Sequence, residues 1–214
     1  MESGTVMEKI FAIGDLHGCF SHLNHLLNKL TIGQNDTLLF LGDYIDRGPD
    51  SYEVVERILR LRSKLAKVIC LKGNHEQMYL DYLRGTDQGL FLSNGGNYTL
   101  QSYEKNGWKY PSPEHLEFFS SLNLYYETDD YIFVHAGLHP NVSLQNQNPE
   151  DLLWIRRRFH TSPNTWNKTI VFGHTPFPEP YTREGKIGID TGACKGGALT
   201  CVELPEMIFY QATV

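Results

Sequence analysis

Short apolar runs along this chain alternate with segments in which apolar residues recur every three or four positions. A run of four to eight apolar residues is typical of a buried strand, and the wider spacing is typical of a helix with one buried face. The runs predict strands at Ile10–Ile13, Thr37–Leu41, Val68–Leu71, Tyr131–His135, Thr169–Phe172, Lys186–Ile189, Ala198–Leu204 and Met207–Gln211.

The helical spacing predicts helices over 20–30, 54–61 and 151–159. The second of these helices has Asp50 or Ser51 as its predicted N-cap, because short polar side chains accept hydrogen bonds from the first helical N–H groups. A further helix is predicted to begin at Ser112, because serine is a favoured N-cap and Pro113 suits the first helical turn.

Strand and helix alternate through the first half of the chain, which predicts an α/β fold with parallel strands. The C-terminal third is rich in strands and in tight glycine turns, at Gly185, Gly192 and 196–197, which predicts antiparallel pairing and therefore mixed sheets. The segment 83–113 has weak periodicity, and we expect a partly ordered excursion near the functional site. With no repeat and no linker, the chain is predicted to form one domain over 1–214.

The composition is that of an ordinary soluble globular protein, with 214 residues, 41% hydrophobic and 21% charged. A net charge of −6 argues against nucleic acid as the main partner. No apolar stretch is long enough to cross a bilayer, and Met1–Lys9 lacks the apolar core of a signal peptide, so we expect a cytoplasmic protein with no membrane partner. No C-x-x-C pair occurs, and free thiols are expected at Cys19, Cys70, Cys194 and Cys201.

Polar clusters that contain glycine recur along the chain, most of them directly after a predicted strand. They are GDLHG at 14–18, GDYIDRG at 42–48, GNHE at 73–76, VHAG at 134–137 and GHT at 173–175. Glycine lets the backbone turn sharply and lets a ligand approach closely. Because each cluster has the same place relative to a strand, the sequence predicts one polar site built from several strand ends.

Several residues in these clusters are possible metal ligands. Asp15 and His17 are two positions apart, so on an extended chain their side chains share a face. The full candidate set is Asp15, His17, Asp43, Asn74, His135 and His174. Each of these alone is explained as a turn former or as a structural histidine. Together they form a mixed oxygen and nitrogen donor set, which suits Mn²⁺, Fe or Zn²⁺ better than Ca²⁺ or Mg²⁺.

The order of these motifs resembles that of the phosphoprotein-phosphatase family of binuclear metallophosphoesterases, above all its short bacterial and phage-type serine/threonine phosphatases. The resemblance runs from about residue 10 to residue 204. It implies a four-layer α/β/β/α sandwich in which two mixed sheets pack face to face, with helices outside and the site at one edge.

The resemblance also implies two divalent ions, with Mn²⁺ the expected metal. Asp15, His17 and Asp43 would hold the first ion, and Asp43, Asn74, His135 and His174 would hold the second. Two ions ~3.5–4 Å apart clamp a phosphoryl group and acidify a bridging water for in-line attack. His75 is then implied as the general acid that protonates the leaving oxygen, and Asp46 as the carboxylate that orients it.

Phosphate binding is implied for Arg47, Arg156 and Asn74. Arg47 has a planar fork that suits two phosphate oxygens. Arg156 belongs to a W-x-R sequence like that of the phage-type members, whereas Arg157 and Arg158 are expected to be solvated or structural. Lys72 stands where the family usually has arginine. Lysine keeps the charge but cannot bind two phosphate oxygens at once as arginine does, so the replacement predicts weaker phosphate binding.

The expected substrate is phosphoserine or phosphothreonine, and perhaps phosphotyrosine, in a phosphoprotein or phosphopeptide. A symmetrical dinucleoside-tetraphosphate hydrolase is the main alternative, although the usual third motif of those enzymes is GNHD and this chain has Glu76. Lys195 precedes the glycine pair at 196–197, where relatives usually have an aromatic residue, and does not decide between the two. A non-catalytic metal-binding protein is a third alternative, disfavoured because the ligands, the acid and an arginine are all present.

Overall fold

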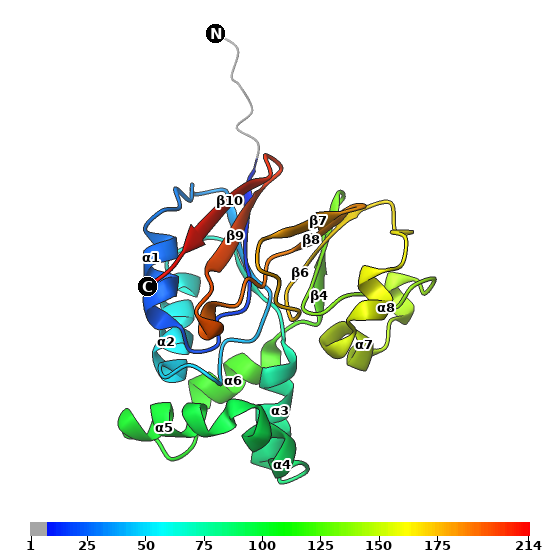
Figure 1. The fold of residues 1–214 in the computed structure, drawn as a ribbon. Coiled ribbons are helices and arrows are strands. Elements are labelled where there is room, and N and C mark those ends of the chain that lie inside the picture. The colour runs from blue at the N-terminus through cyan, green and yellow to red at the C-terminus, as the bar shows by residue number, and fades with distance from the viewer. Residues whose placement is uncertain (1–7) are drawn as a thin grey trace.

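The computed structural model describes residues 8–214, and its strands form two five-stranded sheets (Figure 1). The first sheet has the order β10 (Ile208–Ala212), β9 (Leu199–Leu204), β1 (Ile10–Ile13), β2 (Thr37–Phe40) and β3 (Val68–Cys70). The second has the order β4 (Tyr125–Glu127), β5 (Tyr131–Val134), β6 (Thr169–Phe172), β8 (Lys186–Gly188) and β7 (Tyr181–Arg183). In the first sheet β1, β2 and β3 pair in parallel, and β9 pairs antiparallel with both β1 and β10. In the second, the parallel strands β5, β6 and β8 are flanked by antiparallel β4 and β7. Both sheets are therefore mixed, as the sequence predicts.

The helices lie outside and around the two sheets. They are α1 (Phe20–Leu27), α2 (Ser51–Arg62), α3 (Asn74–Arg84), α4 (Gln88–Phe91), α5 (Asn97–Lys105), α6 (Pro113–Ser121), α7 (Pro149–Trp154) and α8 (Arg157–His160). Short turns of tighter or wider helix occur at η1 (Leu92–Gly96), η2 (Leu144–Asn146) and η3 (Ala193–Lys195). Figure 1 shows α1 and α2 against the first sheet, α7 and α8 beside the second, and α3 to α6 grouped at one end.

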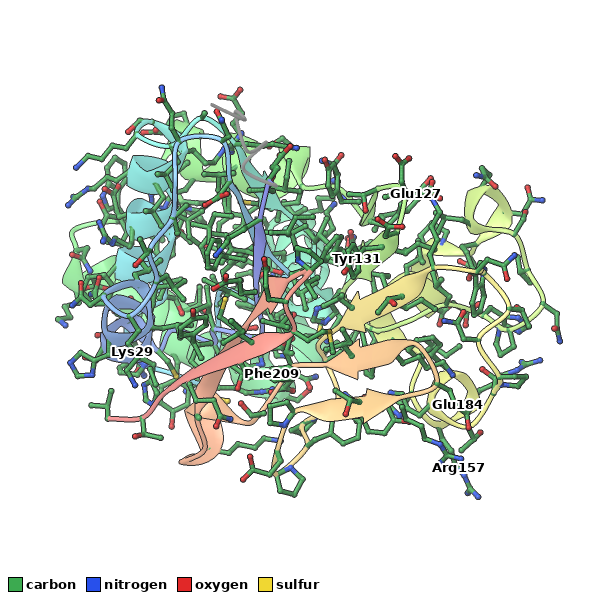
Figure 2. The ribbon with its side chains drawn as sticks, turned by 90° about the horizontal axis from the view of Figure 1, so that it is seen from above. Lys29, Glu127, Tyr131, Arg157, Glu184 and Phe209 are labelled. Carbon is green, nitrogen blue, oxygen red and sulfur yellow. The ribbon has the colours of Figure 1, made fainter. Side chains whose placement is uncertain are left out.

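Side-chain alternation along the strands explains the layering. In β1, Phe11 and Ile13 join the core that the helices cover, while Ala12 faces the second sheet. Successive side chains of a strand point to opposite faces, so one strand feeds two cores. The core between the sheets also contains Leu39 and Val171, and the view from above shows the two sheets side by side (Figure 2). The predicted four-layer α/β/β/α sandwich is confirmed.

Several predicted elements differ from the structure. The helix predicted over 151–159 is wrong, because the chain is extended at Ile155 (φ −60°, ψ 142°) between α7 and α8. The excursion predicted over 83–113 is helical instead, since α4, η1 and α5 follow one another there. Helix α3, which begins at Asn74 directly after the β3 loop, and the short edge strands β4 and β7 were not predicted.

Other local predictions hold. Asp50 is the N-cap position of α2, and the Ser112 hydroxyl accepts a hydrogen bond from the His115 N–H at 3.2 Å, with Pro113 opening α6. The four cysteines form no disulfide, and all lie within residues 8–214. Within that described range, no helix is both long and apolar enough to span a membrane.

Candidate active site

The polar residues that follow the strands meet at one edge of the two sheets. Asp15 follows β1, Asp43 follows β2, and Asn74 opens α3 after β3. From the second sheet, His135 follows β5 directly and His174 lies two residues past β6. All five side chains are buried, with exposed fractions of at most 5%. The predicted assembly of one polar site from several strand ends is therefore what the fold contains.

Glu76 fixes the shape of the Asp43 loop. Its carboxylate accepts hydrogen bonds from the N–H groups of Asp43 (2.9 Å), Tyr44 (2.8 Å) and Gly73 (2.9 Å). Asp43 has a φ of 52°, a left-handed conformation that L-residues adopt only with support from their surroundings. Gly73 is required here, because a Cβ at that position would overlap Asp43 Oδ1.

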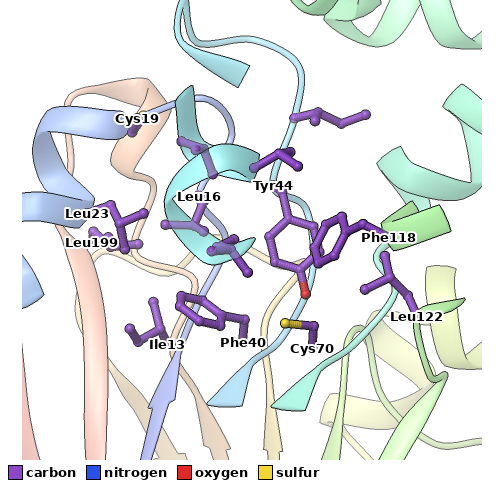
Figure 3. Close-up of a cluster of buried hydrophobic side chains, with 14 of the residues drawn as sticks. Ile13, Leu16, Cys19, Leu23, Phe40, Tyr44, Cys70, Phe118, Leu122 and Leu199 are labelled. Carbon is purple, nitrogen blue, oxygen red and sulfur yellow. The ribbon is translucent and has the colours of Figure 1, made fainter. Parts of the chain in front are cut away.

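The Tyr44 ring holds the same loop by packing into the core that the helices cover. It is fully buried, packs edge-on against Phe118 with 5.3 Å between ring centroids, and donates from its hydroxyl to Leu71 O at 2.6 Å. Figure 3 shows Tyr44 between Phe40, Cys70 and Phe118 in the core that the helices cover. This residue of the GDYIDRG motif therefore contributes to the core, while its neighbours Asp43 and Asp46 face the site.

Nitrogen and oxygen donors converge on one side of Asp43. The His135 Nδ1–H donates to Leu41 O at 3.0 Å, so the neutral ring carries its lone pair on Nε2. That atom lies 3.0 Å from Asn74 Oδ1 and 3.4 Å from Asp43 Oδ1, and His174 Nδ1 lies 2.9 Å from Asn74 Oδ1. Donor atoms of Asp43, His135 and His174 all lie within 4.8 Å of one another. Lone pairs that converge on one small buried volume fit a divalent cation.

A second group of donors lies on the other side of Asp43. Donor atoms of His17, Asp43 and His75 lie within 4.8 Å of one another. His17 donates from Nδ1 to Ile45 O at 2.9 Å, which leaves its Nε2 lone pair 3.5 Å from Asp43 Oδ2. Asp43 thus belongs to both groups, and its role as a ligand shared by two ions stays a prediction.

Asp15 lies at the same edge, and its role as a metal ligand stays a prediction. Both of its carboxylate oxygens lie 3.1 Å from the His174 backbone N–H, so it links the ends of β1 and β6. In the close donor group with His17 and Asp43, the third member is His75 instead. Burial, helped by the nearby Asp190 carboxylate, raises the pKa of Asp15 well above its usual range, and a bound cation would oppose that shift.

Burial also shapes the protonation of the other ligand candidates. It raises the pKa of Asp43 well above normal, with the Glu76 carboxylate adding to the effect. It lowers the pKa of His17 and of His135 to about 3. Neutral imidazole is the form that binds a metal, so these histidines are ready to act as ligands at neutral pH.

His75 and Asp46 form a buried pair. His75 Nδ1 lies 2.6 Å from Asp46 Oδ2, and both side chains are fully buried. Burial lowers the pKa of His75 and raises that of Asp46, because it disfavours the charged form of each group. Among residues 8–214, the opposite ring nitrogen, His75 Nε2, has no hydrogen-bond partner. This nitrogen lies on the side of the ring away from Asp46, 3.9 Å from Asp43 Oδ2 and in the donor group with His17.

Two of the predicted arginines border the site. The Arg47 Nη1–H donates to His17 Nε2 at 2.6 Å. The Arg156 Nη1–H donates to His174 O at 3.0 Å, and the charge of this guanidinium acts on Asp15, Asp190 and Asp43. Arg157 and Arg158 are exposed, and Figure 2 shows Arg157 extending away from the protein body. Of the three consecutive arginines, Arg156 is the one that contacts the site.

Lys72 lies beside the site rather than within it. Its half-buried side chain lines a groove with Gln77, Leu122 and Trp154. The charges that act on it are those of Glu76, Arg84 and Asp81. The weaker phosphate binding expected from Lys72 stays a prediction, which Lys72→Arg tests through its Michaelis constant.

Sequence reasoning missed three residues of the site. The sequence marks Glu76 only as the last residue of the GNHE motif, although its carboxylate holds the Asp43 loop. Asp190 is 6% exposed, and its carboxylate helps to raise the pKa of Asp15. Thr99 hydrogen-bonds Asp46 from α5. Asp190 follows a predicted strand and could have been found by the same rule as Asp43, whereas no pattern marks Thr99.

The fold and the converging donors are those of a phosphoesterase with metal ligands at the strand ends. Residues 8–197 match the calcineurin-like phosphoesterase family, and the chain belongs to that family. Its relatives include the asymmetrical bis(5'-nucleosyl)-tetraphosphatase PrpE of Oceanobacillus iheyensis, 31% identical over 95% of this chain and 91% of the relative. The serine/threonine-protein phosphatase 1 of Salmonella typhimurium is 30% identical, over 91% of both chains.

A solved structure supports the fold independently. The protein titled "Crystal structure of a putative diadenosine tetraphosphatase" superposes with a TM-score of 0.76 over 98% of this chain and 95% of that one, at 22% identity. The predicted resemblance to bacterial phosphoprotein phosphatases is confirmed at the level of the family. The tetraphosphatase of Oceanobacillus iheyensis is named as asymmetrical, so the alternative of a symmetrical dinucleoside-tetraphosphate hydrolase is not favoured.

Proposed function

We propose that this chain is a metal-dependent phosphomonoesterase that removes phosphate from phosphoserine and phosphothreonine in proteins or peptides. The observation that carries the proposal is the buried His75–Asp46 pair, in which His75 Nε2 has no hydrogen-bond partner among residues 8–214. A serine or threonine alkoxide is a strongly basic leaving group, so its departure needs a proton from a positioned acid. An ester whose leaving group is already a weak base needs no such acid.

We expect two divalent ions at this site. Asp15, His17 and Asp43 would hold one, and Asp43, Asn74, His135 and His174 would hold the other. The mixed nitrogen and oxygen donors favour Mn²⁺, with Fe or Zn²⁺ as alternatives. Ions bound there would supply charge neutralisation at the phosphoryl oxygens and lower the pKa of a water nucleophile.

The arginines would bind and orient the phosphoryl group. Arg47 now donates to the His17 Nε2 lone pair. A ligand that takes this lone pair would free the Arg47 guanidinium for phosphate oxygens, which its planar fork suits. Arg156 borders the opposite side of the site, next to His174. Asn74, between the two histidines, would contribute its amide to the same oxygens.

The proton would follow a short path. Asp46 holds His75 Nδ1 and so aims Nε2 at the leaving oxygen. As the bond between phosphorus and that oxygen breaks, Nε2 gives its proton to the serine or threonine oxygen, while water supplies the new oxygen on phosphorus. The free alcohol and inorganic phosphate leave, and the proton released by the attacking water replaces the one His75 gave up.

A second candidate is asymmetrical hydrolysis of a dinucleoside tetraphosphate. The relative of Oceanobacillus iheyensis with that name, at 31% identity, favours it. There the leaving group is a nucleotide, whose phosphate oxygen is a weak base that leaves without protonation. The two candidates therefore differ in how far they depend on His75.

A side-by-side turnover assay with added Mn²⁺ tests the proposal, comparing a phosphoserine/phosphothreonine peptide with diadenosine tetraphosphate. Asp43→Asn is the blank, because Asp43 belongs to both donor groups. We expect fast phosphate release from the peptide. Preference for the dinucleotide would replace the proposed substrate with the second candidate, and no turnover of either would overturn both.

A further inference from the structure

Helix α5 reaches the catalytic pair through one side chain. The Thr99 hydroxyl donates to Asp46 Oδ1 at 2.6 Å and accepts the Asp46 N–H at 2.8 Å. The Ser51 hydroxyl, at the start of α2, lies 3.2 Å from Thr99 Oγ1. A threonine hydroxyl has one proton and two lone pairs, so these partners use all of its hydrogen-bonding capacity. The side chains of Thr99, Asp46 and Ser51 are all fully buried.

A second contact comes from the turn that precedes α5. The Gly95 carbonyl accepts the Arg47 N–H at 3.3 Å. Gly95 has a φ of 98°, and a Cβ there would lie only 3.0 Å from Arg47 N, so glycine suits this position. The segment from α4 to α5, residues 88–105, thus holds both Asp46 and Arg47. We call it the support segment.

Asp46 and Arg47 need such support. Their φ values are 72° and 67°, in the left-handed region. For residues with a Cβ this conformation is unfavourable, and it persists only where neighbouring contacts fix it. Within the described residues, the support segment and Ser51 hydrogen-bond the backbone N–H groups of this dipeptide.

The two Asp46 oxygens have separate partners, and this decides what Thr99 does. Oδ2 faces His75 Nδ1, and Oδ1 accepts from Thr99. Because a carboxylate turns as one planar unit, fixing Oδ1 also fixes Oδ2. We propose that Thr99 is a positioning residue for general-acid catalysis, acting through Asp46 on His75. This inference rests on the proposed phosphomonoesterase function.

Ser102, one turn further along α5, makes hydrogen bonds to α2 instead of to the catalytic pair. Ser102 accepts the Tyr52 N–H at 3.0 Å and donates to Glu53 at 3.2 Å, both on α2. It is 2% exposed and, like Thr99, carries a buried hydroxyl on the inner face of α5. Its hydroxyl bonds Tyr52 and Glu53 of α2 rather than Asp46. Ser102→Ala is therefore the matched control for loss of a buried hydroxyl from this helix.

The experiment compares Thr99→Val, which keeps the shape and removes the hydroxyl, with Thr99→Ser, which restores the hydroxyl. Each is assayed on a phosphoserine peptide and on p-nitrophenyl phosphate. A general acid contributes ~10²–10⁴-fold, so we expect Thr99→Val to lower kcat on the peptide by about tenfold or more, as partial loss of that factor. The aryl ester should lose much less, because its leaving group is a weak base. Thr99→Ser should recover most of the peptide activity.

A second readout needs neither metal nor turnover. A proton in a short, charge-assisted hydrogen bond such as that of His75 Nδ1 with Asp46 has a far-downfield resonance. In metal-free protein, His75→Asn identifies this signal by its disappearance. We expect Thr99→Val to shift or broaden it. Ser102→Ala should leave it in place, while lowering the melting temperature through loss of the Ser102 hydrogen bonds.

The outcomes separate the two proposals. Equal losses on both substrates, no recovery in Thr99→Ser, or an unchanged His75 resonance in Thr99→Val would each overturn the role of Thr99 while the phosphatase function stood. If wild-type protein turned over neither ester, the proposed function would fail. The resonance in Thr99→Val would then still decide whether Thr99 positions the pair.

Discussion

The Glu76 carboxylate holds the backbone of Asp43, whose N–H donates to Glu76 Oε2 at 2.9 Å. Asp43 lies in the loop after β2, whereas Glu76 lies in the first turn of α3, just after the loop that follows β3. Glu76 also accepts from Tyr44 and Gly73, so one buried carboxylate joins both loops. The acidic residue that ends the GNHE motif therefore sets the position of the aspartate shared by both donor groups.

Glu76→Gln should weaken this joint. A glutamine keeps one acceptor oxygen and turns an amide donor toward a backbone N–H, so at least one hydrogen bond to a charged group is lost. Such a bond is worth about 1.5–3 kcal/mol, and we expect the free energy of unfolding to fall by that amount. Urea denaturation measures it, and calorimetric titration with Mn²⁺ should show weaker binding as the Asp43 loop loosens.

Glu104→Gln is the matched control for that substitution. Glu104 is exposed on α5, so its replacement should change stability by less than about 0.5 kcal/mol. A Glu76→Gln protein with the urea midpoint of the wild type would show that the three hydrogen bonds are not what holds the loop.

His75→Asn should separate leaving-group protonation from the rest of catalysis. We expect kcat on a phosphoserine peptide to fall by ~10²–10⁴-fold, and kcat on p-nitrophenyl phosphate to fall far less. The backbone bond from the His75 N–H to Asp43 Oδ1, at 3.1 Å, is kept in this variant. Steady-state kinetics on both substrates measures the difference, and exposed His25→Asn is the control. Undiminished turnover of the peptide would remove His75 as the acid.

Most of the strand-end residues could be predicted because simple patterns place them. Asp43 and His135 follow apolar runs whose ends the structure confirms to within one residue. Once two parallel strands are expected, residues at their carboxyl ends must share an edge of the sheet. The position of Asp43 at the junction of both donor groups followed from that edge together with the family resemblance.

Thr99 and the break before Arg156 could not be predicted in this way. The support segment contains a wide turn at η1 with a left-handed Gly95, so its apolar residues follow no single period. The chain between α7 and α8 is extended at Ile155, and a spacing argument sees only the helical residues on either side. In both places the side chain contacts a distant segment, Thr99 at Asp46 and Arg156 at His174, and local spacing carries no signal of such contacts.

Arg156→Met should impair substrate binding, whereas Arg157→Met should not. Arg156 contacts His174 O and faces the buried carboxylates of the site, while Arg157 extends into solvent (Figure 2). Loss of a hydrogen bond to charged phosphate is worth ~1.5–3 kcal/mol, so we expect kcat/KM to fall by about 10- to 100-fold in the first variant. Kinetics on the phosphoserine peptide measures this. Equal losses in both variants would point to net charge rather than to a specific contact.

Removal of metal should make stability depend on pH in two opposite ways. Burial lowers the pKa of His17 and His135 to about 3, below the value near 6.5 expected when the chain is unfolded. Between those values the unfolded chain binds more protons, so stability falls as the pH drops through that window. Burial raises the pKa of Asp15 and Asp43 above the value near 3.9 expected when the chain is unfolded. Above about pH 4 the folded chain therefore binds more protons, and the free energy of unfolding that these two groups contribute is lost as the pH rises.

Mn²⁺ should therefore stabilise the protein most at neutral pH, where the carboxylates are costly to ionise without a cation and the histidines are already neutral. We expect calorimetry to show a clear rise in melting temperature with Mn²⁺ at neutral pH, shrinking toward about pH 5 as protons compete for the histidines. Metal-free Asp43→Asn should melt higher than metal-free wild type at neutral pH, because it removes a buried charge. It should also lose most of the Mn²⁺ effect. An undiminished Mn²⁺ effect in Asp43→Asn would place the binding site elsewhere.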